Sequence, residues 1–333
     1  MRNTGLADPL LEIIDLKVHF TTDYGVVRAL NGIHLAVEEG HTLGIVGESG
    51  CGKSVSALAI MGLIHRPGRI AGGEILYRRH QEVVPLHLLH PKGSKIRAIR
   101  GNDIAMIFQE PMTSLNPVFT IGYQIMEPIM LHQKKNRRQA RESAVEMLRK
   151  VGIPSPERRV DEYPHQLSGG MRQRAMIAMA LSCRPALLIA DEPTTALDVT
   201  IQAQVLDLMV SLQKEFGASI VMITHDLGVV AGMADEVVVM YLGYIVEKAD
   251  VRSIYRDPRH PYTRGLMTSM PSLITPKANL KPIKGVVPDP YSVPPGCPFE
   301  PRCSEAMPVC RLKNPVLTEV ASGHQVACWL WVE

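Results

Sequence analysis

Short apolar runs alternate with longer amphipathic segments through the first 260 residues of the chain. Four of these runs have the length of strands and almost no polar interruption: Leu43–Val46, Ala186–Ala190, Ile220–Thr224 and Val237–Tyr241. Strands in parallel sheets are buried on both faces and carry continuous runs of this kind. The pattern therefore predicts a parallel sheet at the centre of this region.

The longer segments predict helices that cover the sheet. Val55–Ile64 and Ile201–Phe216 have helical length, and residues 111–180 are rich in helix-forming residues. The first 40 residues and the region Gly72–Tyr77 predict a small antiparallel section instead. Strands that alternate with helices in this way indicate the α/β class.

The distribution of proline divides the chain. Of its 25 prolines, 13 lie within residues 258–333. A length of 333 residues, with 46% hydrophobic and 21% charged residues, is typical of a globular protein with two domains. We predict a larger domain over residues 1–260, with a helical subdomain at about 111–180, and a small Pro- and Cys-rich domain over residues 261–333.

The charge balance argues against a nucleic-acid partner. The formal net charge is +3, whereas nucleic-acid-binding domains usually carry a strongly basic face. The basic run Arg137–Lys150 contains Glu142 and Glu146, so we interpret it as a solvated helix face. No apolar run approaches the roughly 18 residues that a membrane span needs, and Met1–Leu10 lacks the core of a signal peptide. These features predict a cytosolic protein or one bound to a membrane surface.

A phosphate-binding loop is predicted between the first apolar run and the helix after it. The segment Gly-Glu-Ser-Gly-Cys-Gly-Lys-Ser, residues 47–54, matches the pattern G-x-x-x-x-G-K-[ST]. Its glycines let backbone N–H groups surround a phosphate, and the positive end of the helix adds to the field. Lys53 should reach the β- and γ-phosphates, and Ser54 should ligate Mg²⁺. The predicted nucleotide contacts are Gly47, Ser49, Gly50, Cys51, Gly52, Lys53 and Ser54; Cys51 is interpreted as a tolerated small residue rather than a nucleophile.

An acid pair follows a second apolar strand. Ala186–Ala190 leads into Asp191 and Glu192. Asp191 is expected to hold Mg²⁺, and Glu192 to polarise the attacking water as general base. Because no Asn-Lys-x-Asp motif that reads guanine is present, ATP is the favoured nucleotide.

Further segments resemble the motifs of ABC-transporter ATPases, in the order that this superfamily has. Leu167–Met171 (Leu-Ser-Gly-Gly-Met) resembles the signature loop, although Met replaces the usual Gln. Gln109 resembles the Q-loop glutamine, Ala196-Leu197-Asp198 the D-loop, and Thr224-His225-Asp226 the switch-histidine segment. Phe20 resembles the aromatic residue on which adenine stacks, with core packing as the alternative.

Longer segments are similar to one branch of that superfamily, the ATPase subunits of bacterial dipeptide and oligopeptide importers. They are Gln109–Pro117, Tyr163–Met171 and His260–Thr263, and the resemblance runs from about Leu10 to about Trp329. A Met at the fifth signature position is usual in this branch. The resemblance implies a P-loop NTPase fold of the ABC type, with an antiparallel β subdomain and a helical one. It also implies a peripheral location at the cytoplasmic face of the membrane, beneath two permease subunits.

The resemblance also assigns roles and partners. Glu192, His225 and Gln109 would act in ATP cleavage, with Ser54, Gln109 and Asp191 around Mg²⁺. Ser168 and Gly170 would complete the site of a second, homologous ATPase subunit, and an extracytoplasmic binding protein would deliver the peptide. Two rival interpretations stay open at this point. In the first, the transporter carries another solute, such as nickel, glutathione or an opine. In the second, the protein is a soluble ABC ATPase that acts on nucleic acid or ribosomes.

Four of the six cysteines lie near the C-terminus, at positions 297, 303, 310 and 328. A reducing cytosol argues against disulfides and for metal ligation. Structural zinc sites usually pair thiols two to four residues apart, which this spacing lacks. Four thiolates suit a [4Fe–4S] cluster, and Pro298 directly follows Cys297 as in ferredoxin-like loops. The resembling family carries such a cluster in this extension, so [4Fe–4S] is expected at Cys297, Cys303, Cys310 and Cys328, with zinc and unligated thiols as the alternatives.

Overall fold

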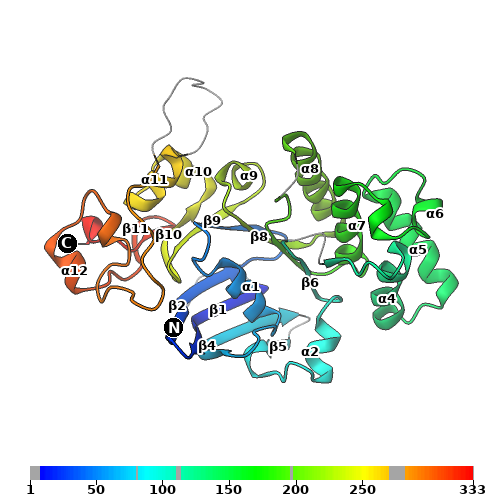
Figure 1. Ribbon diagram of the computed structural model, residues 1–333, viewed down its shortest axis with the longest axis horizontal. Coiled ribbons are helices and arrows are strands. Elements are labelled where there is room, and N and C mark those ends of the chain that lie inside the picture. The colour runs from blue at the N-terminus through cyan, green and yellow to red at the C-terminus, as the bar shows by residue number, and fades with distance from the viewer. Residues whose placement is uncertain (1–7, 80–81, 110–113, 196–197, 270–281, 333) are drawn as a thin grey trace. The chain divides into compact units, whose positions relative to one another are not determined.

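The computed structural model describes residues 8–79, 82–109, 114–195, 198–269 and 282–332. Figure 1 labels the helices and strands of the chain, which divides into two compact units. Unit 1 comprises residues 1–36, 43–87 and 224–333, and unit 2 comprises residues 37–42 and 88–223. Each unit is described by itself, and the predicted domain boundary at residue 260 stays a prediction.

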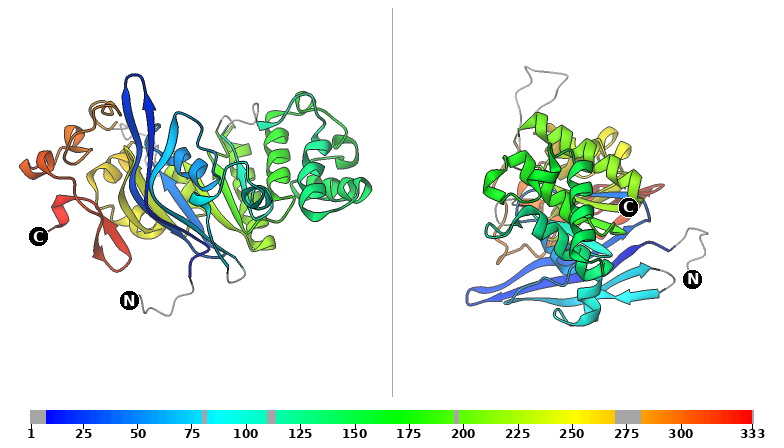
Figure 2. Two further views of the ribbon diagram at one scale, coloured as in Figure 1. Left: turned by 90° about the horizontal axis from the view of Figure 1, so that it is seen from below. Right: turned by 90° about the vertical axis from the view of Figure 1, so that its right-hand side faces the viewer.

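Unit 1 contains an antiparallel sheet of order β2-β1-β4-β5. Its strands are β1 (Leu11–Thr22), β2 (Gly25–Val37), β4 (Gly68–Arg79) and β5 (Glu82–Pro85). Strand β1 pairs with β4 from Leu11 opposite Tyr77 to Phe20 opposite Gly68. The hairpin of β1 and β2 extends as a long ribbon (Figure 2). The antiparallel section that the sequence predicts is therefore confirmed.

A second group of strands in unit 1 has the order β11-β12-β10-β9-β3. Strand β3 (Thr42–Val46) runs parallel to β9 (Glu236–Tyr241), and all five residues of β3 are buried. Antiparallel pairing then adds β10 (Tyr244–Asp250), β12 (His324–Val326) and β11 (Thr318–Ala321). The helices of this unit are α1 (Lys53–Ile60), α9 (Leu227–Ala231), α10 (Val251–Arg256), α11 (Pro261–Thr268) and α12 (Pro308–Leu312). Short 3₁₀ turns are η1 (Leu86–Leu88, across the unit boundary), η3 (Glu300–Arg302) and η4 (Trp329–Trp331).

Helix α1 ends four residues before the predicted end at Ile64. Gly62 adopts φ 61°, a left-handed conformation that glycine reaches without strain. The Leu63 N–H donates to the Leu58 carbonyl at 2.7 Å, and the Gly62 N–H donates to that of Ala59 at 3.0 Å. These two bonds form a Schellman cap. The prediction was wrong here because an apolar run continues through the cap, and hydrophobicity alone does not mark a helix end.

Unit 2 combines three parallel strands with a group of helices. Strands β6 (Ile104–Ile107), β7 (Leu187–Asp191) and β8 (Ser219–Thr224) lie side by side in that order, and every residue in them is buried. The helices are α2 (Ser94–Ile99), α4 (Ile121–Gln133), α5 (Arg137–Lys150), α6 (Pro156–Arg159), α7 (Gly169–Leu181) and α8 (Val199–Phe216), with the 3₁₀ turn η2 (Pro164–Gln166). Helices α4, α5 and α7 pack against one another. The predicted parallel strands and the helix-rich region both appear.

Helix α5 confirms the interpretation of the basic run. Asn136 and Gln139 form a capping box at its start. Arg141 pairs with Asp161 at 2.6 Å and Arg149 with Glu157 at 2.5 Å, through side chains that are largely exposed. Its basic residues therefore form a solvated face with local acidic partners.

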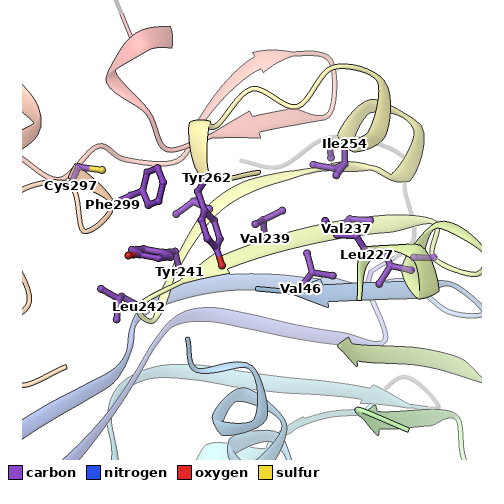
Figure 3. Packing of buried hydrophobic residues seen from close by; sticks show 14 of the residues in the cluster. Val46, Leu227, Val237, Val239, Tyr241, Leu242, Ile254, Tyr262, Cys297 and Phe299 are labelled. Atoms are coloured by element: carbon purple, nitrogen blue, oxygen red, sulfur yellow. The ribbon is translucent and has the colours of Figure 1, made fainter. Parts of the chain in front are cut away.

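Residues beyond 260 are anchored to the core of unit 1 by the buried carboxylate of Glu247 on β10. This carboxylate accepts hydrogen bonds from the backbone N–H groups of Arg259 (2.7 Å) and His260 (2.9 Å). It also contacts the His324 ring on β12, with 2.7 Å between Oε1 and Nε2. Tyr262 and Phe299 pack beside Tyr241 in the same apolar cluster (Figure 3). The C-terminal segment and the strands thus share one core.

The burial of His260 predicts how stability depends on pH. Burial lowers its pKa from 6.5 to about 3, and the charge of Arg264 adds to this effect. Below pH 6.5 the unfolded chain binds a proton at this residue that the folded chain does not bind until about pH 3. The contribution to stability is complete above pH 6.5, and about 2 kcal/mol of it is lost on lowering the pH to 5.

The test compares the wild type with His260→Asn, which keeps an acceptor for the Tyr262 N–H that His260 Nδ1 now caps. The free energy of unfolding, measured in urea at pH 7.5 and pH 5, should fall by about 2 kcal/mol more in the wild type than in the variant. His65→Asn, at an exposed position, controls for the substitution. Equal pH dependence of wild type and His260→Asn would contradict the assignment.

Candidate nucleotide-binding site

The predicted phosphate-binding loop joins β3 to α1 in unit 1, and two of its glycines are required by close backbone contacts. Gly47 has φ 154°, and a Cβ there would lie 2.3 Å from the Met240 carbonyl oxygen on β9. Gly52 has φ 99°, and a Cβ there would lie 2.5 Å from the Ala29 carbonyl oxygen on β2. Contacts this short exclude any side chain. The loop is therefore held against two strands of its own unit.

Lys53 begins α1 and folds back over the loop. Its side chain is buried, and its ammonium group donates to the carbonyl oxygens of Gly47 (2.7 Å) and Glu48 (3.0 Å). Both acceptors are neutral, so these bonds leave the positive charge available to an anion. Ser54 follows in the first turn of the helix and is half-buried. This arrangement can bind phosphate groups at the N-terminus of α1.

Cys51 does not have the surroundings of a nucleophile. It is 3% exposed, and burial raises the pKa of its thiol. A thiol is nucleophilic as the thiolate, which a raised pKa disfavours. Its position in the loop fits the interpretation of a tolerated small residue.

The acid pair lies at the end of β7 in unit 2. Asp191 is the last residue of the strand and is buried. Glu192 has φ 47°, a left-handed conformation that costs free energy for a residue other than glycine. Its backbone N–H donates to the Ile223 carbonyl at 2.8 Å, which fixes this turn against β8. Strain of this kind is common at functional sites.

The structure brings Gln109 and Glu192 together across 83 positions of sequence. Gln109 Nε2 donates to Glu192 Oε2 at 3.0 Å, and Thr195 Oγ1 donates to the same oxygen at 2.9 Å. The amide oxygen of Gln109 remains the atom that could ligate Mg²⁺. Thr195 was not among the residues predicted from the sequence, although it lies only three residues after Glu192.

The signature segment forms the start of α7 in unit 2. Ser168 is exposed and is the N-cap of this 13-residue helix, and its hydroxyl accepts from the Met171 N–H at 3.3 Å. Gly170 lies in the first turn, and a Cβ there would contact Ile201 at 3.1 Å. The Gln173 side chain donates to the Pro193 carbonyl, so α7 is tied to the turn after Glu192. This connection was not predicted from the sequence.

The remaining candidates take separate positions. His225 is exposed between β8 and α9, and the next residue, Asp226, caps α9. The half-buried Phe20 ring on β1 packs over Gly68, whose Cβ would lie 2.5 Å from Cε1. Of the D-loop, Ala196 and Leu197 lie outside the described residues, and Asp198 is the N-cap of α8. The loop residues and His225 belong to unit 1 and the acid pair to unit 2, so the ligand set Ser54, Gln109 and Asp191 stays a prediction.

The four C-terminal cysteines come together in unit 1. Cys297, Cys310 and Cys328 are buried and Cys303 is half-buried. Burial, with the neighbouring thiols, raises the pKa of Cys297 and of Cys328 to about 11, and burial also raises that of Cys303. Across the part of the chain that the structure describes, however, no three Cys, His, Asp or Glu side chains are arranged to hold a metal ion. The thiols are neighbours, and a closed ligand shell is not formed.

In the described segments, no helix is both long enough and apolar enough to span a bilayer.

Comparison with known proteins identifies the family. The family model described as "ABC transporter" matches residues 30–195, and the one described as "Oligopeptide/dipeptide transporter, C-terminal region" matches residues 246–310. The probable peptide ABC transporter ATP-binding protein y4tR of Sinorhizobium fredii is 52% identical over 331 residues, which cover 99% of this chain and 97% of that protein. The dipeptide transport ATP-binding protein DppD of Escherichia coli is 49% identical over 319 residues, 96% of each chain.

A solved structure agrees with these sequence matches. It is the dimeric post-hydrolysis state of the ATP-binding cassette MJ0796 bound to ADP and Pi, with a TM-score of 0.64 and 25% identity. The match covers 73% of this chain and 99% of that one. The fold is thus that of a P-loop NTPase of the ABC type. On identities near 50% across almost its full length, the chain belongs to the family of ATP-binding proteins of ABC transporters, in the branch that carries the oligopeptide/dipeptide transporter C-terminal region.

Proposed function

We propose that this protein hydrolyses ATP to power the import of dipeptides or oligopeptides through an ABC transporter, at the cytoplasmic face of the membrane. The similarity to peptide and dipeptide transport ATP-binding proteins, which includes the C-terminal region, carries this proposal. These relatives favour a peptide over nickel, glutathione or an opine as the solute. They also favour a transporter subunit over a soluble ATPase that acts on nucleic acid.

The chemistry follows from residues whose positions are known within each unit. The backbone of Gly47–Gly52 and the Lys53 ammonium bind the phosphates, while Ser54, Gln109 and Asp191 would hold Mg²⁺, which neutralises phosphate charge. Glu192 accepts a proton from the water that attacks the γ-phosphate, and ADP leaves with the bridging oxygen. Gln109 and Thr195 both donate to one carboxylate oxygen of Glu192 and so fix the orientation of the group that takes the proton.

The signature loop would act on the partner's nucleotide. Ser168 is exposed at a helix N-terminus, where its hydroxyl and the following N–H groups can bind an anion. A similar solved cassette is described as a dimer. These observations support a pair of ATPase subunits, this chain and a homologous one, in which Ser168 and Gly170 complete the opposite site. Closure on ATP and opening after hydrolysis is then a population shift.

The helical region offers a surface for the permeases. Phe119 and Tyr123 stack at 4.6 Å between ring centroids and are each more than 40% exposed, with exposed Val118 beside them. Exposed aromatic clusters commonly mark sites of protein–protein contact. This surface supports docking to two permease subunits, which an extracytoplasmic binding protein would supply with peptide.

We also propose that the four C-terminal cysteines hold a [4Fe–4S] cluster. The four thiols are neighbours in unit 1 and three of them are buried, which supports this assignment because four thiolates are the ligands that such a cluster needs. The raised pKa values mean that ligation would displace protons from Cys297 and Cys328. The cluster would stabilise the surrounding loops, and none of the steps above uses it.

The first test concerns the general base. Glu192→Gln should retain ATP binding and lower turnover by about 10²- to 10⁴-fold, because a neutral amide cannot accept the proton from water. Steady-state phosphate release is measured in the assembled transporter, with the exposed Glu146→Gln on α5 as a control. If Glu192→Gln turns over ATP at nearly the rate of the wild type, Glu192 is not the general base.

The second test concerns the shared site. Ser168→Arg places a long cation where the partner's γ-phosphate should lie, so turnover in the assembled transporter should fall by about tenfold or more. ATP affinity of the isolated subunit should stay unchanged, since that ATP lies on the chain's own Lys53. Ser211→Arg, at an exposed position on α8, is the matched control. An equal loss of affinity in the isolated subunit would contradict the model of a shared interface.

The third test concerns the cysteines. Protein purified without oxygen should be brown and contain about four irons and four sulfides per chain. Cys303→Ser should lose the colour and increase proteolysis within residues 297–328, because metal binding and folding are coupled there. Cys183→Ser, a half-buried thiol of unit 2, should leave both unchanged. Stoichiometric zinc in colourless protein would show that the cysteines bind zinc and not an iron–sulfur cluster. Metal-free protein would show that they bind neither.

A further inference from the structure

Glu48, the second residue of the phosphate-binding loop, is held at three places. Its backbone N–H donates to the Tyr262 hydroxyl oxygen at 2.8 Å, and its carbonyl accepts from Lys53 at 3.0 Å. Its carboxylate accepts two hydrogen bonds from Arg302, at 2.6 Å from Nη1 and 3.0 Å from Nη2. Tyr262 and Arg302 both come from the C-terminal 75 residues of the chain. The loop is therefore clamped by the segment that follows the ATPase core.

The surroundings of Arg302 fix its guanidinium group. The side chain is 4% exposed, and its Nε donates to the Lys284 carbonyl at 3.2 Å. The guanidinium carbon lies 5.8 Å from the centroid of the Tyr241 ring, and Nη1 donates to the Tyr241 hydroxyl at 3.4 Å. The paired carboxylate of Glu48 is the largest cause of a raised pKa at Arg302. A buried, bidentate arginine of this kind sets geometry as well as charge.

The position of Arg302 is set by the segment that carries the cysteines, residues 297–310. This residue ends the turn η3, which lies between Cys297 and Cys303. The Cys297 N–H donates to the Cys310 carbonyl at 2.7 Å, and the Cys303 N–H donates to the Glu300 carbonyl at 3.1 Å. Phe299 packs at the start of this turn beside Tyr241 and Tyr262, with centroids 5.3 and 5.4 Å away (Figure 3). Order in this segment thus determines where the guanidinium lies.

The carboxylate of Glu48, inside a loop that binds phosphates, would by itself weaken the binding of an anion. Its charge repels the polyphosphate, and the repulsion is strong where protein excludes water. Arg302 neutralises that charge, and the bidentate geometry keeps the carboxylate turned toward the arginine. Without the arginine, the carboxylate could instead approach the phosphates or pair with Lys53 and withdraw it.

We propose that Arg302 is a positioning residue for the phosphate-binding loop, and that through Glu48 it couples the order of the C-terminal cysteine segment to ATP affinity. The inference rests on the proposed function of this loop as an ATP site. Linkage makes the effect reciprocal, so bound ATP should also stabilise the segment around residues 297–310.

The test measures MgATP binding to the full-length protein by calorimetry. Arg302→Gln should raise the dissociation constant by about tenfold or more, and 1 M salt should reduce this effect, because the uncovered charge of Glu48 is then screened. Arg302→Lys keeps the charge and loses the bidentate geometry, so its dissociation constant should lie between those of the wild type and Arg302→Gln. Arg311→Gln removes an arginine that pairs with Glu300 at 2.9 Å in the same segment and should bind as the wild type does.

The double variant Arg302→Gln/Glu48→Gln separates the proposal from a structural defect. Removing the carboxylate removes the repulsion, so the double variant should recover most of the lost affinity. A segment that had merely unfolded would not be rescued in this way. In the wild type, hydrogen exchange at residues 297–310 should slow when MgATP is added, and in Arg302→Gln it should not.

The possible results have distinct meanings. Absence of MgATP binding by the wild type would overturn the proposed function together with this inference. Wild-type binding with unchanged affinity in Arg302→Gln, or a double variant as weak as the single one, would overturn the inference alone. The inference is supported if Arg302→Gln loses affinity for MgATP and the double variant recovers it.

Discussion

The close approach of backbone to backbone at Gly47 and Gly52 is the constraint on which the nucleotide site depends. Side chains at these positions would lie 2.3 and 2.5 Å from carbonyl oxygens on β9 and β2. The loop lies this close to β9 and β2 because β3, which leads into it, is buried beside β9 in the apolar sheet. With the loop fixed there, the N-terminus of α1 and the Lys53 ammonium lie where phosphates can bind. Packing of an apolar sheet thus prepares a polar site.

The acid pair shows the same dependence of chemistry on a buried strand. Strand β7 is wholly buried and ends at Asp191, directly before the strained Glu192. The strain is tolerated because the Glu192 backbone bonds to β8 and its side chain accepts from Gln109 and Thr195. A rigid frame around a strained carboxylate fixes where its oxygens lie, as proton transfer from water requires.

The sequence was sufficient for the parts of the molecule that local pattern encodes. Continuous apolar runs marked β3, β7, β8 and β9, and the loop and the acid pair lie at the strand ends where their motifs predict them. The end of α1 was missed because a glycine in an apolar run carries no signal until its φ is known. Thr195 was missed because a threonine near an acid carries no signal until the backbone turn between them is known. The contacts of Tyr262 and Arg302 with the loop were missed because they depend on packing between distant segments, and Glu48 and Arg302 are 254 positions apart.

The long-range contacts show that the C-terminal segment is part of the core of unit 1. From composition it is a Pro- and Cys-rich appendix, separate from the ATPase core. In the structure Glu247 joins β10 to the backbone at residues 259–260 and to β12, and Tyr262 and Phe299 complete the apolar cluster around Tyr241. Arg302, whose guanidinium lies 5.8 Å from the centroid of the Tyr241 ring, pairs with Glu48 of the phosphate-binding loop. Since the buried guanidinium of Arg302 needs the Glu48 carboxylate to offset its desolvation, the loop and the cysteine segment support each other within unit 1.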